Sequence, residues 1–333
     1  MNLPRERRLG NAETPRGTGD ISFFGDGDEA LELSKTHAFF LAWISICRRR
    51  KGDTYPVLVG AVAPRHEANV SIEILSRSEI QKMRIAGRAA AETLARVKER
   101  LVPGTSTAAI DAFVREETAR RGGKPSQLGY DGFPASVCTS VNEVVCHGIP
   151  RTDVILRDGD IVNVDVTTEL RGYHGDTSAT FFVGAPSALA AKVVRVAEAC
   201  RDAGISVIRE GARLGDIGAA IEELAKNEGC SVVRDFGGHG IGRKMHMAPH
   251  VSHVGTRGMG PRLRAGMALT VEPMVNLGGA DVVVLADGWT VITRDGSLSA
   301  QFEHTIVVTR DGCEIMTSLD DRASLGGLER AIR

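Results

Sequence analysis

The stretch GDIVNVDVTTEL, residues 159–170, alternates between apolar and polar side chains and decides how the chain around it folds. Valine occupies positions 162, 164 and 166, and the polar residues Asn163, Asp165 and Thr167 follow each valine in turn. Successive side chains of a strand point to opposite faces, so the valines share one face and the polar residues share the other. The pattern predicts a strand with one buried face, and it places the carboxylate of Asp165 in the middle of that strand.

The same strand belongs to an internal repeat. A shift of 107 positions, from 104 to 211, aligns residues 104–165 with residues 211–272 without gaps. Identical pairs include Gly104 and Gly211, Ile110 and Ile217, Gly122 and Gly229, Leu156 and Leu263, Gly159 and Gly266, and Val164 and Val271. The repeat predicts two duplicated α/β halves packed as pseudo-symmetric lobes, with Asp165 and Glu272 meeting near the axis. The alternative is that similar turn and strand segments merely resemble each other.

Helical segments complete each half. Ser76 with Glu79 forms a capping-box pattern, which predicts a helix from about residue 76. The sequence Pro-Gly-Thr at 103–105 predicts a break before a second helix that ends near Gly122. Further helices are predicted at about 188–207 and 211–226. The expected order is two helices, strands, two helices and strands.

The composition excludes several classes of protein. The 333 residues include 41 basic and 42 acidic ones, and 42% of all residues are hydrophobic. These proportions are typical of a soluble globular protein and argue against a disordered chain, a membrane bundle or a surface that coats nucleic acid. The six cysteines form no CxxC pair, so a reducing compartment is expected.

Residues 1–71 differ from the rest and are expected to form an N-terminal extension of unknown role. The apolar run HAFFLAWISIC at 37–47 is shorter than the roughly 20 residues of a membrane helix. It also lies too far along the chain for an ordinary signal peptide, so it is interpreted as a docked hydrophobic segment rather than a targeting element. A start codon placed too early would produce the same appearance. Residues 72–316 are expected to form one folded domain, followed by a tail at 317–333.

Two further strands are predicted to carry acids on a polar face: Glu272 in GMALTVEPMV and Glu303 in SAQFEHTIVVT. An isolated buried carboxylate costs several kcal/mol unless it is paired or bound to a cation. With Asp176 of GYHGDTSA and His239 of FGGHGIG, the set reaches four carboxylates and one imidazole. Such a set suits two divalent ions and is unlike a structural thiolate zinc site. Taken alone, each acid is more simply a solvent contact on an edge strand.

Two histidines lie beside loop-like segments, where catalytic residues are often displayed: His147 in VVCHGIP and His246, seven residues after His239. An imidazole can donate or accept a proton at neutral pH. The alternative for each is a structural histidine with satisfied hydrogen bonds. That second interpretation is kept for the other histidines, which are His37, His66, His174, His250, His253 and His304.

Six motifs together resemble the type I methionine aminopeptidases: VNEVVCHGIP, GDIVNVDV, HGDTSATF, GGHGIG, TVEPMVN and SAQFEHTIVVT. The resemblance covers about residues 72–316 and implies the α/β (α+β) pita-bread fold, in which pseudo-two-fold duplicated halves share a mostly antiparallel sheet covered by helices. It implies a catalytic domain that removes the initiator methionine from nascent chains. It further implies a monomeric cytoplasmic enzyme with a transient ribosome contact, no nucleic-acid specificity and no membrane association.

The resemblance also implies roles for individual residues. Asp165 would bind one metal ion through both oxygens, Asp176 and Glu303 would bridge two ions, and His239 and Glu272 would complete the second ion. The ions would be two divalent cations, cobalt, manganese, iron(II), zinc or nickel, with a bridging water or hydroxide as the nucleophile.

Further roles follow from the same likeness. Glu272 would also shuttle a proton, His246 would stabilise the oxyanion, and His147 would meet the scissile amide. The methionine pocket would be formed by Tyr130, Phe133, Cys138, Met245 and Trp289. The alternative for Tyr130 and Phe133 is ordinary loop packing.

The chain departs from the family pattern near the expected pocket. Asp131 stands where many bacterial members have histidine, Gln127 where cysteine is common, and Met245 where phenylalanine is usual, while Met247 and Ala248 replace an acidic pair. These changes are expected to affect the width of the pocket and the tolerance for the second residue of the substrate. Two other functions stay open: a catalytically weak binding module of the same fold, and a proline-directed aminopeptidase.

Overall fold

The computed structural model describes residues 57–58 and 71–319. The predicted extension lies outside the described residues except at 57–58 and 71, and so do His37, His66 and most of the predicted tail. The proposed domain boundaries therefore stay a prediction. None of the helices within the described ranges has the length and apolar character required to cross a bilayer.

Four α-helices and two short 3₁₀ helices form the helical part of the described chain. They are α1 Arg77–Val97, η1 Lys98–Arg100, α2 Thr107–Arg120, η2 Tyr130–Gly132, α3 Ala188–Ser206 and α4 Leu214–Asn227. The predicted start of α1 is confirmed, because Glu79 Oε2 accepts hydrogen bonds from the Ser76 backbone N–H at 2.8 Å and from Ser76 Oγ at 2.7 Å. The start of α4 was predicted three residues too early, because Gly211 adopts φ +87° in the preceding turn.

The strands pair antiparallel throughout the described residues. In the first half they are β2 Lys124–Pro125, β3 Cys138–Val141, β4 Val144–Cys146, β5 Ile161–Leu170 and β6 Tyr173–Phe182. In the second half they are β7 Ser231–Val232, β8 Gly238–Gly240, β9 Met247–Val251, β10 Ala268–Val271, β11 Met274–Asn276, β12 Val282–Leu285, β13 Val291–Thr293, β14 Ser299–Gln301, β15 His304–Val308 and β16 Cys313–Ile315. β1 Val57–Leu58 pairs with β12.

The predicted duplication is confirmed by details that recur at the same spacing of 107 residues. Both ends of α2 map onto both ends of α4. The N–H of Gly104 donates to Leu156 O at 2.8 Å, and the N–H of Gly211 donates to Leu263 O at 2.9 Å. An isolated bridge joins Ser106 to Ile155 in the first half, and its counterpart joins Arg213 to Arg262 in the second. The two halves are therefore copies of one supersecondary unit.

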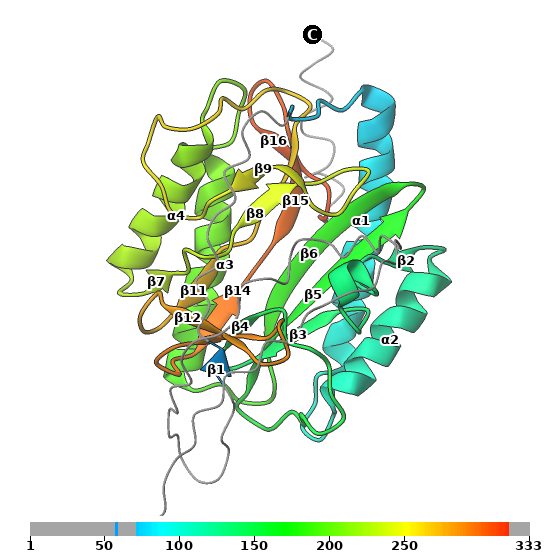
Figure 1. Ribbon diagram of the computed structural model, residues 1–333, viewed down its shortest axis with the longest axis vertical. Helices are drawn as coiled ribbons and strands as arrows, with labels where there is room; N and C mark the ends of the chain where they lie inside the picture. Colours follow the sequence, from blue (N-terminus) through cyan, green and yellow to red (C-terminus); the bar gives the residue numbers. More distant parts are fainter. Residues whose placement is uncertain (1–56, 59–70, 320–333) are drawn as a thin grey trace, which may run out of the picture. The chain divides into compact units, whose positions relative to one another are not determined.

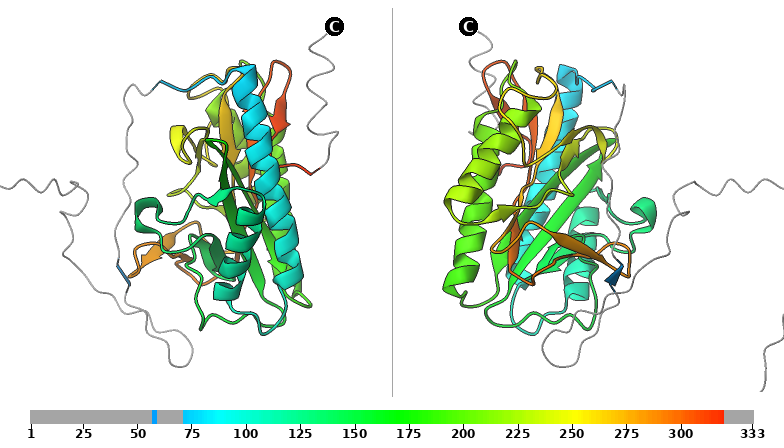
Figure 2. Two further views of the ribbon diagram at one scale, coloured as in Figure 1. Left: turned by 90° about the vertical axis from the view of Figure 1, so that its right-hand side faces the viewer. Right: turned by 60° about the vertical axis from the view of Figure 1, so that its left-hand side comes forward.

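The helices of each half lie on its own strands (Figures 1 and 2), and the two largest apolar clusters fall mainly one in each half. In the first half, α1 and α2 cover β5, whose Val162, Val164 and Val166 are buried, as the alternation predicted. In the second half, α3 and α4 pack on β10, β11, β14 and β15. The polar faces of the strands are left for the region where the halves meet.

The two halves join where β6 lies beside β14 and β15, through threonine side chains. Thr305 Oγ1 accepts the backbone N–H of Asp176 at 3.0 Å and donates to Asp176 O at 2.8 Å. Thr180 Oγ1 donates to Gln301 O at 2.8 Å. Because hydroxyls replace part of the ordinary strand pairing, the two halves are held together along a polar seam.

Glu272 and Glu303 do not lie within strands, contrary to the sequence expectation. Glu272 occupies the break between β10 and β11, and Glu303 the break between β14 and β15. Pro273 has no N–H to donate to a strand partner, which explains the first break. In the second, the N–H of Glu303 donates to Ser178 O of the other half at 2.9 Å. Both carboxylates thus stand at the seam.

Gly175→Ala is expected to destabilise the fold by about 1–3 kcal/mol, because α1 and β6 touch through two glycines. A Cβ at Gly175 would overlap the backbone of Gly87 on α1. Chemical denaturation measures the free energy of unfolding. Gly312→Ala is the matched control, since a Cβ there meets no atom within 4 Å. Equal stability of the two variants would contradict this packing argument.

Candidate active site

A cavity of about 330 Å³ lies between the two halves and receives side chains from both. The five residues predicted to form a pocket all line it: Tyr130, Phe133, Cys138, Met245 and Trp289. The two singled-out histidines and four of the five predicted ligands also line it: His147, His246, Asp165, Asp176, His239 and Glu272. The fifth predicted ligand, Glu303, lies close to Asp176 and His239. The structure thus brings every predicted site residue to one place.

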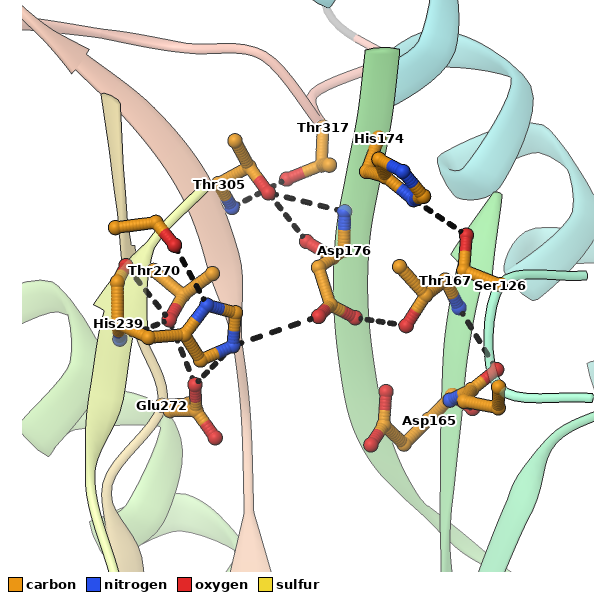
Figure 3. Close-up of polar contacts among 12 residues, drawn as sticks. Ser126, Asp165, Thr167, His174, Asp176, His239, Thr270, Glu272, Thr305 and Thr317 are labelled. Atoms are coloured by element: carbon orange, nitrogen blue, oxygen red, sulfur yellow. Dashed lines mark hydrogen bonds and ion pairs between the residues drawn. The ribbon is translucent and has the colours of Figure 1, made fainter. Parts of the chain in front are cut away.

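Two of the carboxylates come from the neighbouring strands β5 and β6. Asp176 lies opposite Thr167 in the register, and Thr167 Oγ1 donates to Asp176 Oδ1 at 2.7 Å. Asp165 points toward the same space, as Figure 3 shows. Its buried Oδ1 has no hydrogen-bond partner among the described residues. A buried carboxylate oxygen without a donor requires a cation or a proton to compensate it.

His239 presents an unprotonated nitrogen to the acids. Its Nδ1 lies 3.1 Å from Gly240 O, a carbonyl that can only accept, so Nδ1 carries the proton. Nε2 therefore holds a lone pair, and it lies 3.7 Å from Asp176 Oδ2 and 3.5 Å from Glu272 Oε1. A backbone carbonyl that fixes the tautomer in this way is typical of a histidine that binds metal.

The two glutamates are held by different means. Thr270 Oγ1 donates to Glu272 Oε1 at 2.7 Å, and Gln301 Nε2 donates to Glu272 Oε2 at 3.2 Å. Glu303 is only 2% exposed, and its buried Oε1 has no partner among the described residues. One ligand atom each from Asp176, His239 and Glu303 lie within 4.8 Å of one another. This spacing allows a single cation to contact all three residues.

The electrostatics of the cavity favour a cation. No lysine or arginine is among the described residues that line it. Burial raises the pKa of the Asp165 and Glu303 carboxyls well above their ordinary values. Burial, together with the charge of Asp176, raises the pKa of Glu272 to about 8, and burial raises that of Asp176 to about 6. Divalent cations would restore the charged forms of all four groups.

Metal binding is expected to stabilise the protein more strongly as the pH rises. A carboxyl whose folded-state pKa is raised gives stability that is full below its unfolded value and is lost as the pH rises through the folded value. For Glu272 this window runs from 4.5 to about 8. Removing the metal should therefore lower Tm by ~5–10 °C at pH 8 and by less than ~3 °C near pH 5. Calorimetry with and without chelator tests this, and a pH-independent difference would contradict it.

The apolar side of the cavity is built from aromatic rings packed edge to face. The ring centroids of Phe133 and Trp289 lie 5.1 Å apart. The ring centroid of His147 lies 5.6 Å from that of Phe236 and 6.2 Å from that of Trp289. Burial lowers the pKa of His147 to about 4, so its imidazole is neutral at physiological pH. His246 lies with its ring centroid 4.2 Å from that of His239 and 4.9 Å from that of Tyr130.

Several supporting residues were missed from the sequence. Thr270 and Gln301 hold Glu272, and the buried His253, interpreted as structural, accepts the Glu272 backbone N–H at Nε2 over 3.1 Å. Cys146, Phe236 and Met274 also line the cavity. In the sequence, the only indication of Thr270 and Gln301 is that alternation places them on the same faces as Glu272 and Glu303. His174 forms a hydrogen bond with Ser126, and His304 forms one with Thr317, which is consistent with structural roles.

Three of the departures from the family pattern can be placed in the structure. Gln127 spans the edge of β5, because its Nε2 donates to Asp165 O at 2.8 Å and its Oε1 accepts the Thr167 N–H at 3.2 Å. It thereby fixes the backbone on both sides of Val166, directly after Asp165. Asp131 adopts φ +45° in η2, next to Tyr130 at the cavity. Met245 is buried at the cavity wall.

The duplicated fold and its buried cluster of carboxylates and imidazole define a metallopeptidase. The model of "Metallopeptidase family M24" matches residues 81–310. Methionine aminopeptidase A of Synechocystis is 53% identical over 247 residues, which cover 74% of this chain and 98% of the relative. The methionine aminopeptidase of Escherichia coli is 46% identical over 253 residues, 76% of this chain and 96% of the relative. The chain belongs to the methionine aminopeptidases of family M24.

Solved structures agree with this assignment. The crystal structure of methionine aminopeptidase from Rickettsia prowazekii matches with a TM-score of 0.73 at 47% identity, over 74% of this chain and all of the other. Prolidase from Pyrococcus furiosus matches with a TM-score of 0.60 at 19% identity, over 74% of this chain and 66% of the other, and shares the fold alone. The prediction of a pita-bread enzyme is confirmed, and the methionine-directed activity is supported over the binding-module and proline-directed alternatives.

Proposed function

We propose that this enzyme hydrolyses the N-terminal methionine from peptides and nascent chains with two divalent cations held by Asp165, Asp176, His239, Glu272 and Glu303. The observation that carries the proposal is the buried cluster itself. Asp165 Oδ1 and Glu303 Oε1 are buried without hydrogen-bond donors among the described residues. Oxygen ligands with one imidazole suit borderline or hard divalent ions such as manganese, iron(II), cobalt, zinc or nickel.

The division of ligands is taken from the family resemblance, and the grouping of the side chains agrees with it. Asp176 and Glu303 lie close to His239, on opposite sides of the seam, and by that resemblance they would serve both ions. Asp165 is proposed to bind the ion on the β5 side, and Glu272 with His239 the ion on the β8 side. When bound, the cations would lower the pKa of a water molecule and polarise the scissile carbonyl.

The remaining chemistry belongs to side chains of this chain. Glu272 is held by Thr270 and Gln301 at the cavity wall, and we assign it the transfer of a proton to the leaving amine. His246 is assigned the hydrogen bond to the developing oxyanion, because its ring lies beside His239 at the cavity. His147 is assigned the contact with the scissile amide, which a neutral imidazole can make as donor or acceptor.

The methionine side chain is proposed to enter the apolar part of the cavity. Phe133 and Cys138 are buried there, and Trp289 packs edge-on against Phe133. A thioether makes favourable contacts with aromatic edges and bends to fill an irregular space. Tyr130 and Met245 are proposed to close the pocket from the η2 and β8–β9 sides.

A peptide assay tests the function. Full-length protein supplied with manganese, iron(II) or cobalt should release methionine from Met-Ala-Ser, and an Xaa-Pro dipeptide should be hydrolysed far more slowly. Metal analysis after reconstitution should find bound ions. No release of methionine with any of these metals would overturn the proposal, and preferred cleavage of the dipeptide would establish the proline-directed alternative.

The setting in the cell is also a proposal. Every newly made chain begins with an initiator methionine, which supports action in the cytoplasm on nascent chains, with a transient ribosome contact. The enzyme is proposed to act as a monomer, because the described cavity draws its lining from both halves of one chain. Residues 1–71 are proposed to be an extension outside the catalytic domain.

A further inference from the structure

The loop at 241–246 connects β8 to β9 and contributes two adjacent residues to the lining of the cavity. Met245 is 6% exposed and forms part of the wall, and His246 lies beside His239. The same loop faces solvent at Arg243 and Lys244. A small displacement of this loop would therefore move a pocket wall and the proposed oxyanion donor together.

The outer side of the loop is tied to two other elements. Arg243 Nη2 donates to Glu79 Oε1 in the first turn of α1. The Arg243 guanidinium also lies over the ring of Tyr173 at the start of β6, 5.1 Å from its centroid. One residue earlier, Gly242 O accepts the backbone N–H of His174 at 2.9 Å. The backbone bond fixes one point of the loop, and the Arg243 side chain fixes the next.

Glu79 is also fixed by hydrogen bonds from residues other than Arg243. Its Oε2 accepts the N–H and the hydroxyl of Ser76, and its Oε1 accepts the hydroxyl of Tyr173 at 2.9 Å. The hydrogen bonds from Ser76, followed by that from Tyr173, lower the pKa of Glu79 to about 2, so the carboxylate is charged at every working pH. A preorganised acceptor loses little conformational freedom when it binds the guanidinium.

We propose that Glu79 is a positioning residue of this enzyme, which acts through Arg243 to fix the loop that presents Met245 and His246 to the substrate. The inference rests on the proposed function, since it takes from there the roles of His246 and of the pocket. It assigns the α1 cap a second task besides starting the helix: it anchors a segment 164 residues away in sequence.

An ion pair whose guanidinium is largely exposed contributes little to stability, so the effect should appear mainly in turnover rather than in unfolding. Glu79→Gln keeps the size of the side chain and removes the carboxylate charge nearest to Arg243, whose Nε also lies 3.7 Å from Glu73 Oε1. Arg243→Gln breaks the same contact from the loop side and leaves the helix cap intact. With metal-loaded full-length protein and Met-Ala-Ser, each variant should lose ~10-fold in kcat, because small misplacements of catalytic groups are costly. KM should change less than kcat, and Tm should fall by less than ~3 °C.

Two control variants separate positioning from general damage to α1. Ser76→Ala removes the hydroxyl bond to Glu79 Oε2, while the backbone N–H of residue 76 and the Tyr173 hydroxyl still hold Glu79, and the Glu79 to Arg243 contact stays in place. Glu314→Gln breaks the bond from Arg84 Nη2 to Glu314 Oε2, at 2.7 Å, which ties α1 to β16 away from the loop. Both should lower Tm while retaining the kcat of the wild type.

A double-mutant cycle completes the test. If Glu79 acts through His246, Glu79→Gln should cost much less in a His246→Ala background than in the wild type. Wild-type kcat in both Glu79→Gln and Arg243→Gln would overturn the inference, as would an equal loss in the two controls or full additivity with His246→Ala. Absence of methionine release by the wild type would instead contradict the proposed function.

Discussion

Asp165→Asn is expected to lower methionine release by more than ~100-fold and to reduce the metal content of the purified enzyme. Even residues that only orient metal ligands cost 10–100-fold when they are replaced, so removing a direct carboxylate ligand should cost more. Asp165 Oδ1 is buried without a hydrogen-bond donor among the described residues, and an amide in its place would offer a weaker neutral ligand. Metal analysis and the Met-Ala-Ser assay on the same preparation measure both effects.

Asp235→Asn is the matched control for this experiment. Asp235 lines the same cavity but is exposed, and its carboxylate lies outside the proposed ligand set. The control variant should keep the metal content of the wild type. Wild-type metal content together with wild-type turnover in Asp165→Asn would refute the assignment of Asp165 as a ligand.

His246→Ala is expected to keep the metal ions and to lower kcat by ~10²–10³-fold. This is the usual cost of removing one hydrogen-bond donor from an oxyanion site. The His246 ring lies 4.2 Å from that of His239, close enough to face a substrate carbonyl at the proposed metal site. Because the loss falls on an interaction made in the transition state, KM should change far less than kcat.

His250→Ala provides the comparison for that second experiment. His250 also lines the cavity, opposite His239 in the β8 to β9 register, and no catalytic role is assigned to it. It should retain most of the turnover. If His246→Ala lost its metal ions, His246 would be a ligand rather than an oxyanion donor, and the proposed division of roles would be wrong.

The elements of each half could be predicted because their signals are local. The alternation at 159–170 depends only on neighbouring residues, and β5 begins at Ile161 and ends at Leu170 within that stretch. The capping box of Ser76 and Glu79 lies within one turn, and α1 begins at Arg77. The repeat predicted the symmetry, because duplicated sequences form the same turns, as Gly104 and Gly211 show.

The breaks that place Glu272 and Glu303 were not predicted from alternation. Pro273 is a local signal for the break at Glu272. The break at Glu303 depends on the hydrogen bond from the Glu303 N–H to Ser178 O in the other half. A pattern of period two shows which face a residue shares and not whether its strand continues. The four acids and the imidazole could be collected from the sequence, but the resemblance to a family, rather than spacing, supplied the role of each ligand.

The sequence by itself determined the helices, the buried valine face of β5, the duplication and the residue types of the site. Only the tertiary structure decided that Asp176 lies beside Thr305, that Gln127 spans the edge of β5, and that Glu79 holds Arg243. Local order follows from backbone periodicity and capping, which adjacent residues define. The site and its supports are formed by contacts between residues as many as 164 positions apart, and these exist only once both halves have packed.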